Sequence, residues 1–363
     1  MNKINSKQIE QTLAAYQEPY LEKDLVTAKV LQTCHINQQT VTVDLQFGFP
    51  IQTLKQSIQA SLQALVKEAF PNYKFIFNIT QKIIAHQVQP AVKAHPAIKN
   101  IIAVGSGKGG VGKSTTAVNI ALGLQQAGAQ VGLLDADIYG PNQPLILGKK
   151  TKPTVVDKKF EPVMCYGLQT NSIGYLIEDD QAMIWRGPMV SGALLQLLND
   201  TRWQALDYLI IDLPPGTGDV QLTLAKQVPV SGAVIVTTPQ KVAVADAEKS
   251  VAMFKRVKVP ILGIVENMSV YHCPHCHTST HLFGAAGGRE LATKYQLSLL
   301  AEIPLELTIR EQTDQGRPAI LIPESNISFI YQYLALKIAA RLSLQPKNWM
   351  VNFPQVIVEN RPA

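Results

Sequence analysis

Two short segments of this 363-residue chain combine residue types that could do chemistry, and the first is rich in glycine. It reads Gly107-Lys108-Gly109-Gly110-Val111-Gly112-Lys113-Ser114-Thr115. Glycines at this spacing let successive backbone N–H groups curl around phosphate oxygens, and a following helix directs its positive end at the anion. Lys113 would contact the β- and γ-phosphates, and the Ser114 hydroxyl would bind Mg²⁺. The segment therefore predicts a P-loop that binds ATP and Mg²⁺.

A dinucleotide site is the alternative for the same loop, because Gly107, Gly109 and Gly112 also fit Gly-x-Gly-x-x-Gly. That interpretation leaves Lys113 without a role. The next acidic residues at a strand end lie later than the spacing of about 20 residues that a dinucleotide site needs. The P-loop is the favoured interpretation.

Carboxylates at the ends of neighbouring apolar runs are candidates for metal and water binding. Asp212 follows the apolar run 209–211 and starts a turn rich in proline and glycine that reaches Asp219. Such a turn can respond to the γ-phosphate and rearrange on hydrolysis. Asp135 and Asp137 end a second apolar run, and Asp137 is expected to orient the attacking water. The alternative for Asp137 and Asp212 is a helix N-cap.

The second segment is Cys273-Pro274-His275-Cys276, which places two thiols on one turn where both could face the same metal. Two thiolates do not complete a tetrahedral site. Either further ligands lie in this chain, as in a Cys₂His₂ zinc knuckle, or a homodimer supplies the four thiolates of a [4Fe–4S] cluster. Four of the seven histidines surround the segment: His272, His275, His277 and His281. Cys34 and Cys165 have no partner at motif spacing and are expected to be core residues.

The elements that position these residues fall into two domains. Residues 1–88 are predicted to form a small α+β domain, with strands at 41–47 and 74–79 and a helix that presents Leu54, Ile58, Leu62 and Leu65. Residues 89–100 lack periodicity and contain two prolines, so they are expected to be a linker.

Residues 101–344 are predicted to form the nucleotide-binding domain. Short, continuously apolar runs alternate there with helical patterns such as 115–127 and 243–255, which is typical of a doubly wound α/β fold with a mostly parallel sheet. Residues 327–342 are expected to form a final helix that packs on the core, and residues 345–363 a tail on the surface. The predicted buried strands are 101–104, 131–134, 209–211, 233–236, 261–265 and 299–303.

Composition limits the class of protein. With 46% hydrophobic and 17% charged residues, the chain can bury large cores, and it contains no run of about 18 apolar residues that would cross a membrane. The net charge of +6 is dispersed, without a run of five basic residues, so we expect no nucleic-acid or membrane partner. The first thirty residues contain no signal-peptide core, which predicts a cytoplasmic protein.

Lys108 makes the loop resemble the deviant P-loop class, which includes the nitrogenase iron protein and the Min and Par ATPases. The chain as a whole resembles the Mrp (ApbC) family of iron–sulfur cluster carrier ATPases over roughly residues 101–320. Its N-terminal unit looks like the small domain of many bacterial members. The matching stretches are 105–114, 134–142, Trp185-Arg186-Gly187-Pro188-Met189, 212–219, Glu266-Asn267-Met268-Ser269, Cys273 with Cys276, Phe283-Gly284 and 302–305.

This resemblance implies a homodimeric ATPase that receives a [4Fe–4S] cluster from a donor or scaffold and passes it to apo iron–sulfur proteins. It implies that Lys108 reaches the partner's phosphates, that Asn267 lies near the adenine, and that Cys273 and Cys276 hold a cluster bridging the dimer. The chain departs from the family at His277-Thr278, where many members have Gly-His, and it lacks a cysteine in 47–51. The competing interpretations are a partition ATPase acting on membrane or DNA and a zinc-stabilised P-loop ATPase without cluster transfer.

Overall fold

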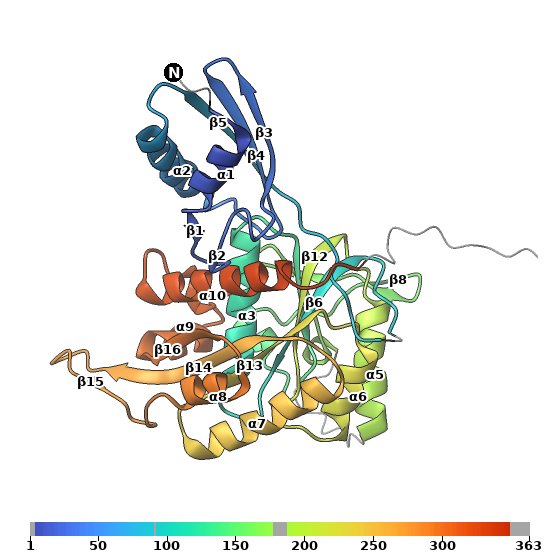
Figure 1. The fold of residues 1–363 in the computed structure, drawn as a ribbon. Helices are drawn as coiled ribbons and strands as arrows, with labels where there is room; N and C mark the ends of the chain where they lie inside the picture. The colour runs from blue at the N-terminus through green and yellow to red at the C-terminus, as the bar shows by residue number, and fades with distance from the viewer. Residues whose placement is uncertain (1–3, 91, 177–186, 349–363) are drawn as a thin grey trace, which may run out of the picture.

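A three-stranded sheet covered by two helices forms the N-terminal domain of the computed structural model, which describes residues 4–90, 92–176 and 187–348 (Figure 1). The predicted strands and helix are confirmed, although Val66 rather than Leu65 completes the buried stripe of the helix. In the order β3-β4-β5, the first pair is antiparallel and the second parallel. The elements are α1 (Ser6–Leu13), β1 (Gln17–Glu18), β2 (Lys23–Asp24), β3 (Leu31–Asn37), β4 (Thr40–Phe47), α2 (Lys55–Ala69) and β5 (Lys74–Gln81).

The second domain is built on a sheet whose seven central strands are parallel, in the order β11-β7-β12-β6-β13-β14-β16. All six predicted buried strands are present, which confirms the doubly wound α/β fold. The parallel strands are β6 (Ile98–Gly105), β7 (Val131–Asp135), β11 (Leu168–Ser172), β12 (Leu206–Asp212), β13 (Gly232–Thr237), β14 (Ile261–His272) and β16 (Leu299–Leu305). Antiparallel β10 (Val163–Cys165) and β15 (Ser279–Thr280) extend the edges, and β8 (Val155–Val156) pairs with β9 (Lys159–Phe160).

Helices cover both faces of this sheet because alternate strand residues point to opposite sides. Ile102 and Val104 of β6 pack in the core that contains α3 and α10, whereas Ile101 and Ala103 pack in the core that contains α5, α6, α7 and α8. None of the described helices is long and apolar enough to cross a membrane. The helices are α3 (Lys113–Gln126), α4 (Gln143–Ile146), α5 (Gly187–Asp200), α6 (Asp219–Gln227), α7 (Lys241–Arg256), α8 (Gly287–Tyr295), α9 (Leu307–Asp314) and α10 (Asn326–Ser343).

The N-terminal domain packs on α3 and α10, and its core is continuous with theirs (Figure 1). Glu22 forms ion pairs with Lys337, at 2.9 Å, and with Arg341, at 3.4 Å, and the ring of Tyr20 contacts that of Tyr333. As expected, α10 is mostly buried. The two domains therefore share an extensive interface.

The predicted linker is held firmly against the second domain. Its last three residues already belong to β6, which begins at Ile98. The buried Gln89 side chain donates to the carbonyls of Ala225 and Val228 and accepts from the N–H of Val230. Residues 345–348 of the predicted tail run along the connection between the domains, where Asn348 N–H donates to the Ala85 carbonyl. Trp185, Arg186 and the rest of the tail lie outside the described residues.

Candidate functional site

The glycine-rich loop connects β6 to α3, as the sequence predicts. Gly110 and Gly112 have φ values of +80° and +84°, which favour glycine, and α3 begins at Lys113. A Cβ atom at Gly107 would collide with the backbone of Asp246 in α7, so that position also requires glycine. The loop therefore combines the backbone freedom and the helix N-terminus that a phosphate site needs.

Asn267 on β14 contacts this loop directly. Its side-chain amide donates a 2.9 Å hydrogen bond to the Val111 carbonyl, and a Cβ atom at Gly112 would collide with it. Asn267 therefore fixes the shape of the loop, whereas its expected position near the adenine remains a prediction.

Lys113 lies at the centre of a buried group of charges. Its ammonium group is 2.5 Å from Asp212 Oδ1 and 3.6 Å from Asp137 Oδ2, and it donates to Ser114 Oγ at 3.4 Å. The strand register explains this convergence, because Asp212 of β12 lies beside Asp135 of β7 at the carboxyl ends of the two strands. The structure thus brings together Lys113, Ser114, Asp137 and Asp212 as the sequence predicts.

Two further side chains complete this group. Burial, and then the negative charge of Asp212, raise the pKa of Asp135 to about 7. The Gln143 amide donates to Asp212 Oδ2 at 2.9 Å and to the Ser114 carbonyl at 3.0 Å. The sequence singled out Asp135 without giving it a role, and it gave no signal for Gln143 other than its place directly after the matching stretch 134–142.

Asp137 has the surroundings of a proton acceptor that burial has made more basic. Desolvation raises its pKa and the Asp212 charge adds to this, although the Lys113 ammonium opposes both. Its side chain remains 10% exposed, so a small polar molecule can reach it. These properties are compatible with the predicted role in orienting water.

Lys108 and the turn after Asp212 form the outer rim of the loop. Lys108 is exposed, and its ammonium group has no ion pair or hydrogen bond within the described chain. Gly216 in the turn donates to the Ser106 carbonyl at 2.8 Å, and the Ser106 hydroxyl donates to the Lys108 carbonyl at 2.9 Å. The turn and the P-loop are therefore tied to each other through Ser106.

The two thiols lie on the loop of a hairpin formed by β14 and β15, which projects from the second domain (Figure 1). His277 N–H donates to the Cys273 carbonyl at 2.9 Å, and Cys273 N–H donates to the Thr278 carbonyl at 3.1 Å. His277 has a φ of +57°, a conformation that glycine adopts more easily. The departure from Gly-His thus places a histidine where the backbone favours glycine.

The hairpin stabilises one thiolate. The Thr278 hydroxyl, its backbone N–H and the Cys273 thiol lower the pKa of Cys276 to about 7, and Cys276 Sγ lies 3.4 Å from Thr278 Oγ1. Thiolate is the form that binds metals. Cys273 is partly buried and Cys276 is exposed, so the pair is accessible from outside.

The surrounding histidines do not complete a metal site with the two thiols. His272 contacts the Ser279 hydroxyl and His281 contacts the Ser269 carbonyl, each at 2.9 Å. Among residues 4–90, 92–176 and 187–348, no group of three or more His, Cys, Asp or Glu side chains converges to hold a metal. Cys34 and Cys165 are half-buried and pack against the core, as expected.

Replacing Thr278 with valine is expected to make Cys276 less reactive near pH 7. Removing the hydroxyl should move the pKa of the thiol from about 7 towards its ordinary value of 9.0, so the alkylation rate should rise only at higher pH. The measurement is the rate of iodoacetamide labelling against pH, with tandem mass spectrometry separating Cys276 from Cys273. Thr280→Val, on the adjacent strand β15, is the matched control and should leave the profile unchanged. An unchanged profile in Thr278→Val would contradict the assigned cause.

Known proteins share both domains. A family model described as "NUBPL iron-transfer P-loop NTPase" matches residues 97–339, and one described as "Iron-sulfur cluster assembly protein" matches residues 6–74. The "Iron-sulfur cluster carrier protein" of Escherichia coli (strain K12) is 48% identical over 342 residues, which cover 92% of this chain and 91% of that protein. The "Iron-sulfur cluster transfer protein NUBPL" of Mus musculus is 45% identical over 262 residues, which cover 71% of this chain and 82% of that protein.

Solved structures agree with these matches. A nucleotide-binding protein from Archaeoglobus fulgidus in complex with ADP is 40% identical with a TM-score of 0.55, and the match covers 63% of this chain and 90% of that one. The cell division ATPase MinD of Pyrococcus furiosus is 24% identical with a TM-score of 0.50, and the match covers 66% of this chain and 98% of MinD. The latter likeness shows the fold alone.

Proposed function

Because the chain belongs to the NUBPL iron-transfer family of P-loop NTPases, we propose that it binds an iron–sulfur cluster and transfers it to apo-proteins, coupled to ATP binding and hydrolysis. The observation that carries the proposal is the accessible pair Cys273 and Cys276, whose hairpin extends from the strand that contacts the P-loop. Two thiols with one pKa near 7 suit a site that takes up and releases iron.

The backbone N–H groups of residues 107–115 would hold the phosphates of ATP, and Lys113 would neutralise their charge. The Mg²⁺ ion would bind Ser114 and Asp212 and, when bound, would offset the phosphate charge. The buried group supports this, since the single Lys113 ammonium contacts both Asp137 and Asp212 and Asp135 lies beside Asp212. Mg²⁺ commonly takes one or two carboxylates and completes its shell with phosphates and water. Asp137 would orient the water that attacks the γ-phosphate.

Lys108 would act across a homodimer, on the phosphates held by the partner chain. Its exposure and its lack of a partner within the described residues support this role. Lys108→Ala is expected to keep nucleotide affinity within a few-fold, because the loop backbone and Lys113 remain. Hydrolysis should fall about 10²- to 10³-fold, the usual effect of losing one preorganised charge. Nucleotide titration and a long ATPase assay measure the two effects.

Mixed dimers separate action in trans from action within one chain. A dimer of one Lys108→Ala chain and one Lys113→Ala chain has a composite site that keeps both lysines, if Lys108 acts in trans. We therefore expect partial recovery of ATPase activity on mixing. Absence of recovery, with heterodimers demonstrated by native mass spectrometry, would show that Lys108 acts within its own chain.

The cluster itself is the cargo, and we propose that a [4Fe–4S] cluster bridges two chains. Each chain offers two thiols, and no third protein ligand converges on them within the described part of the chain. A four-thiolate shell therefore needs a second copy. The same observation weighs against a zinc knuckle within one chain, which requires two histidines beside the thiols.

Strand β14 would couple the two sites. Asn267 contacts the P-loop carbonyl, and Cys273 follows six residues later, at most about 20 Å along an extended strand. Met268 between them has a φ of +57°, and the pairing with β16 shifts there, so the strand is bent between its two contacts. Movement of the P-loop would thus change the position of the hairpin.

The recipients would be apo iron–sulfur proteins, and a donor or scaffold would load the carrier in the cytoplasm. A partition-type role on membrane or DNA leaves the thiol pair without a function. The test is anaerobic reconstitution followed by visible absorption and analysis of iron, sulfide and zinc. Broad absorption with about four irons and four sulfides per dimer is expected for one bridging cluster. Protein that holds only zinc would overturn the proposal.

A further inference from the structure

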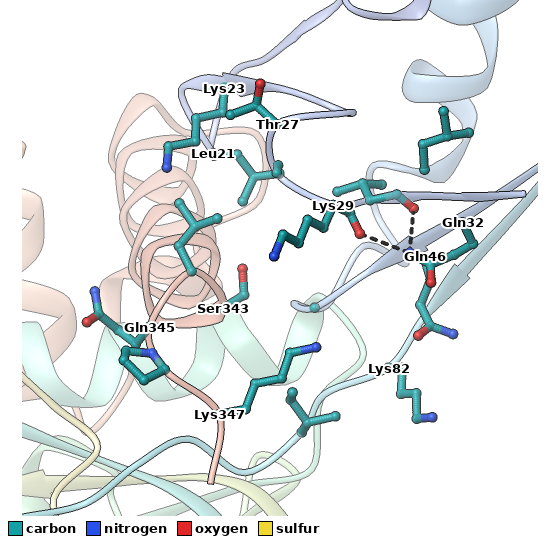
Figure 2. A pocket seen from close by; sticks show the side chains of 17 residues that line it. Leu21, Lys23, Thr27, Lys29, Gln32, Gln46, Lys82, Ser343, Gln345 and Lys347 are labelled. Carbon is teal, nitrogen blue, oxygen red and sulfur yellow. Dashed lines mark hydrogen bonds between the residues drawn. The ribbon is translucent and has the colours of Figure 1, made fainter. Parts of the chain in front are cut away.

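A cavity of about 810 Å³ lies between the N-terminal domain and the end of α10, away from the P-loop and the thiol hairpin (Figure 2). Both domains line it. The N-terminal domain contributes Leu21, Lys23, residues 27–32, Gln46 and Gly48, and the second domain contributes residues 343–347. The two walls approach each other closely beside the cavity, because a Cβ atom at Gly48 would press on Ser343.

The charges that line this cavity are all positive. Four of the seventeen lining residues are lysines and none is acidic, although the whole chain has 33 basic and 27 acidic residues. None of the four ammonium groups has an ion pair within the described residues. The two acidic residues next to Lys23 in the sequence are Glu22, which forms ion pairs with Lys337 and Arg341, and Asp24, which accepts hydrogen bonds from the Val26 and Thr27 N–H groups. The lining lysines are Lys23, Lys29, Lys82 and Lys347.

Figure 2 shows Lys29 and Lys347 extending from opposite walls towards the space between them, with Lys23 and Lys82 nearer its edges. Lys29 is presented by a backbone turn with a φ of +57°, and the Gln32 amide braces this turn by donating to the Lys29 and Val30 carbonyls. Lys347 lies on a segment that pairs with His86. Both cations therefore project from ordered backbone.

We propose that this cavity binds a small molecule that carries at least two phosphate or carboxylate groups. Several like charges around a concavity focus their field on it and attract multivalent anions. The volume is in the range of small-ligand pockets, and Leu21, Val30 and Leu344 offer apolar contact beside the lysines. An acidic protein segment would instead bind better to a flat or extended basic surface than to a cavity of this shape. A ligand held by Lys29 and Lys347 would bridge the two domains.

The test uses the full chain with its P-loop saturated by ADP, so that phosphate probes report on other sites. Inorganic pyrophosphate and citrate are titrated separately by calorimetry at low and moderate salt. We expect saturable binding of one equivalent of at least one probe, weakened by added salt. Pyrophosphate alone would indicate a phosphate ligand, citrate alone a polycarboxylate, and both a general anion site. The proposal does not depend on cluster transfer.

A double variant, Lys29→Gln with Lys347→Gln, identifies the site. Each lost lysine contact should weaken the affinity for the probe about two- to fivefold, so the double variant should bind it about tenfold more weakly. The control, Lys55→Gln with Lys67→Gln on α2, removes the same charge outside the cavity and should change affinity less than twofold. In addition, bound probe should protect Lys29 and Lys347, but not Lys67, from acylation.

Three outcomes would overturn the proposal. They are the absence of saturable binding of either probe, an equal loss of affinity in both double variants, and binding of a hexaglutamate peptide when neither small probe binds. The last of these would identify the cavity as part of a protein-docking surface.

Discussion

Replacing either Cys273 or Cys276 with serine is expected to abolish cluster binding while leaving ATP binding intact. A serine hydroxyl stays protonated at neutral pH and is a poor ligand for iron. In a bridged dimer, one substitution per chain removes two of four ligands, so each single variant should behave almost like the double variant. The hairpin lies outside the nucleotide site, and β14 connects the two. Iron and sulfide per dimer, visible absorption and transfer to an apo-protein are the measurements.

Cys34→Ser and Cys165→Ser are the matched controls, because both thiols are half-buried and lie apart from the hairpin. These variants should keep wild-type iron and sulfide. A zinc knuckle within one chain would lose one ligand of four and could retain weakened metal. Wild-type iron and sulfide in the Cys273→Ser and Cys276→Ser variants would refute the carrier hypothesis.

Lys113→Ala is expected to reduce ATP hydrolysis about 10²- to 10³-fold, which corresponds to about 3–4 kcal/mol of transition-state stabilisation. The structure adds an effect on stability. Removing the ammonium leaves Asp137 and Asp212 buried without their cation, and breaking a buried ion pair typically costs about 3–5 kcal/mol. The free energy of unfolding in denaturant, measured beside the ATPase rate, reports both effects. Asp212→Ala should also lose hydrolysis, through its effect on Mg²⁺.

Lys99→Ala provides the matched control for stability. Lys99 forms a 2.7 Å ion pair with Asp207 on β12, but its side chain is 48% exposed. Exposed ion pairs contribute about 0–1 kcal/mol to the free energy of unfolding. This variant should therefore remain close to wild type in both stability and ATPase rate. Wild-type ATPase activity in folded Lys113→Ala would show that the loop is not the catalytic site.

Of the seven parallel strands in the second domain, the sequence predicted the six whose residues are mostly apolar and missed one that is polar. Strand β11 is fully buried, yet it contains Gln169, Thr170 and Asn171. Their side chains are satisfied by distant partners: the Gln169 amide donates to the Gln204 carbonyl, and the Asn171 amide to the Thr201 hydroxyl. A hydropathy pattern cannot reveal such a strand, because burial of its polar groups depends on tertiary hydrogen bonds.

The residues of the candidate site also divide into those that the sequence predicts and those that only the fold reveals. Fixed spacing within one loop identified Lys113 and Ser114, and the position of Asp212 after an apolar run identified a strand-end carboxylate. The contacts of Gln143 with Asp212 and of Asn267 with Val111 join residues 69 and 156 positions apart. Only the strand order brings these together, so spacing alone could not predict them. Likewise, no pattern within the predicted linker could show that the buried hydrogen bonds of Gln89 are to residues more than 130 positions later.

The projecting hairpin has a consequence for how much cargo the protein can hold. If each chain contributes only Cys273 and Cys276, no single chain can keep a cluster, and occupancy obeys mass action between two copies. Loading would then rise with the square of the free chain concentration, and dilution would itself favour release. The abundance of the protein would therefore set the fraction of chains that carry cargo, in addition to any effect of nucleotide, and an excess of empty chains would act as a buffer for clusters.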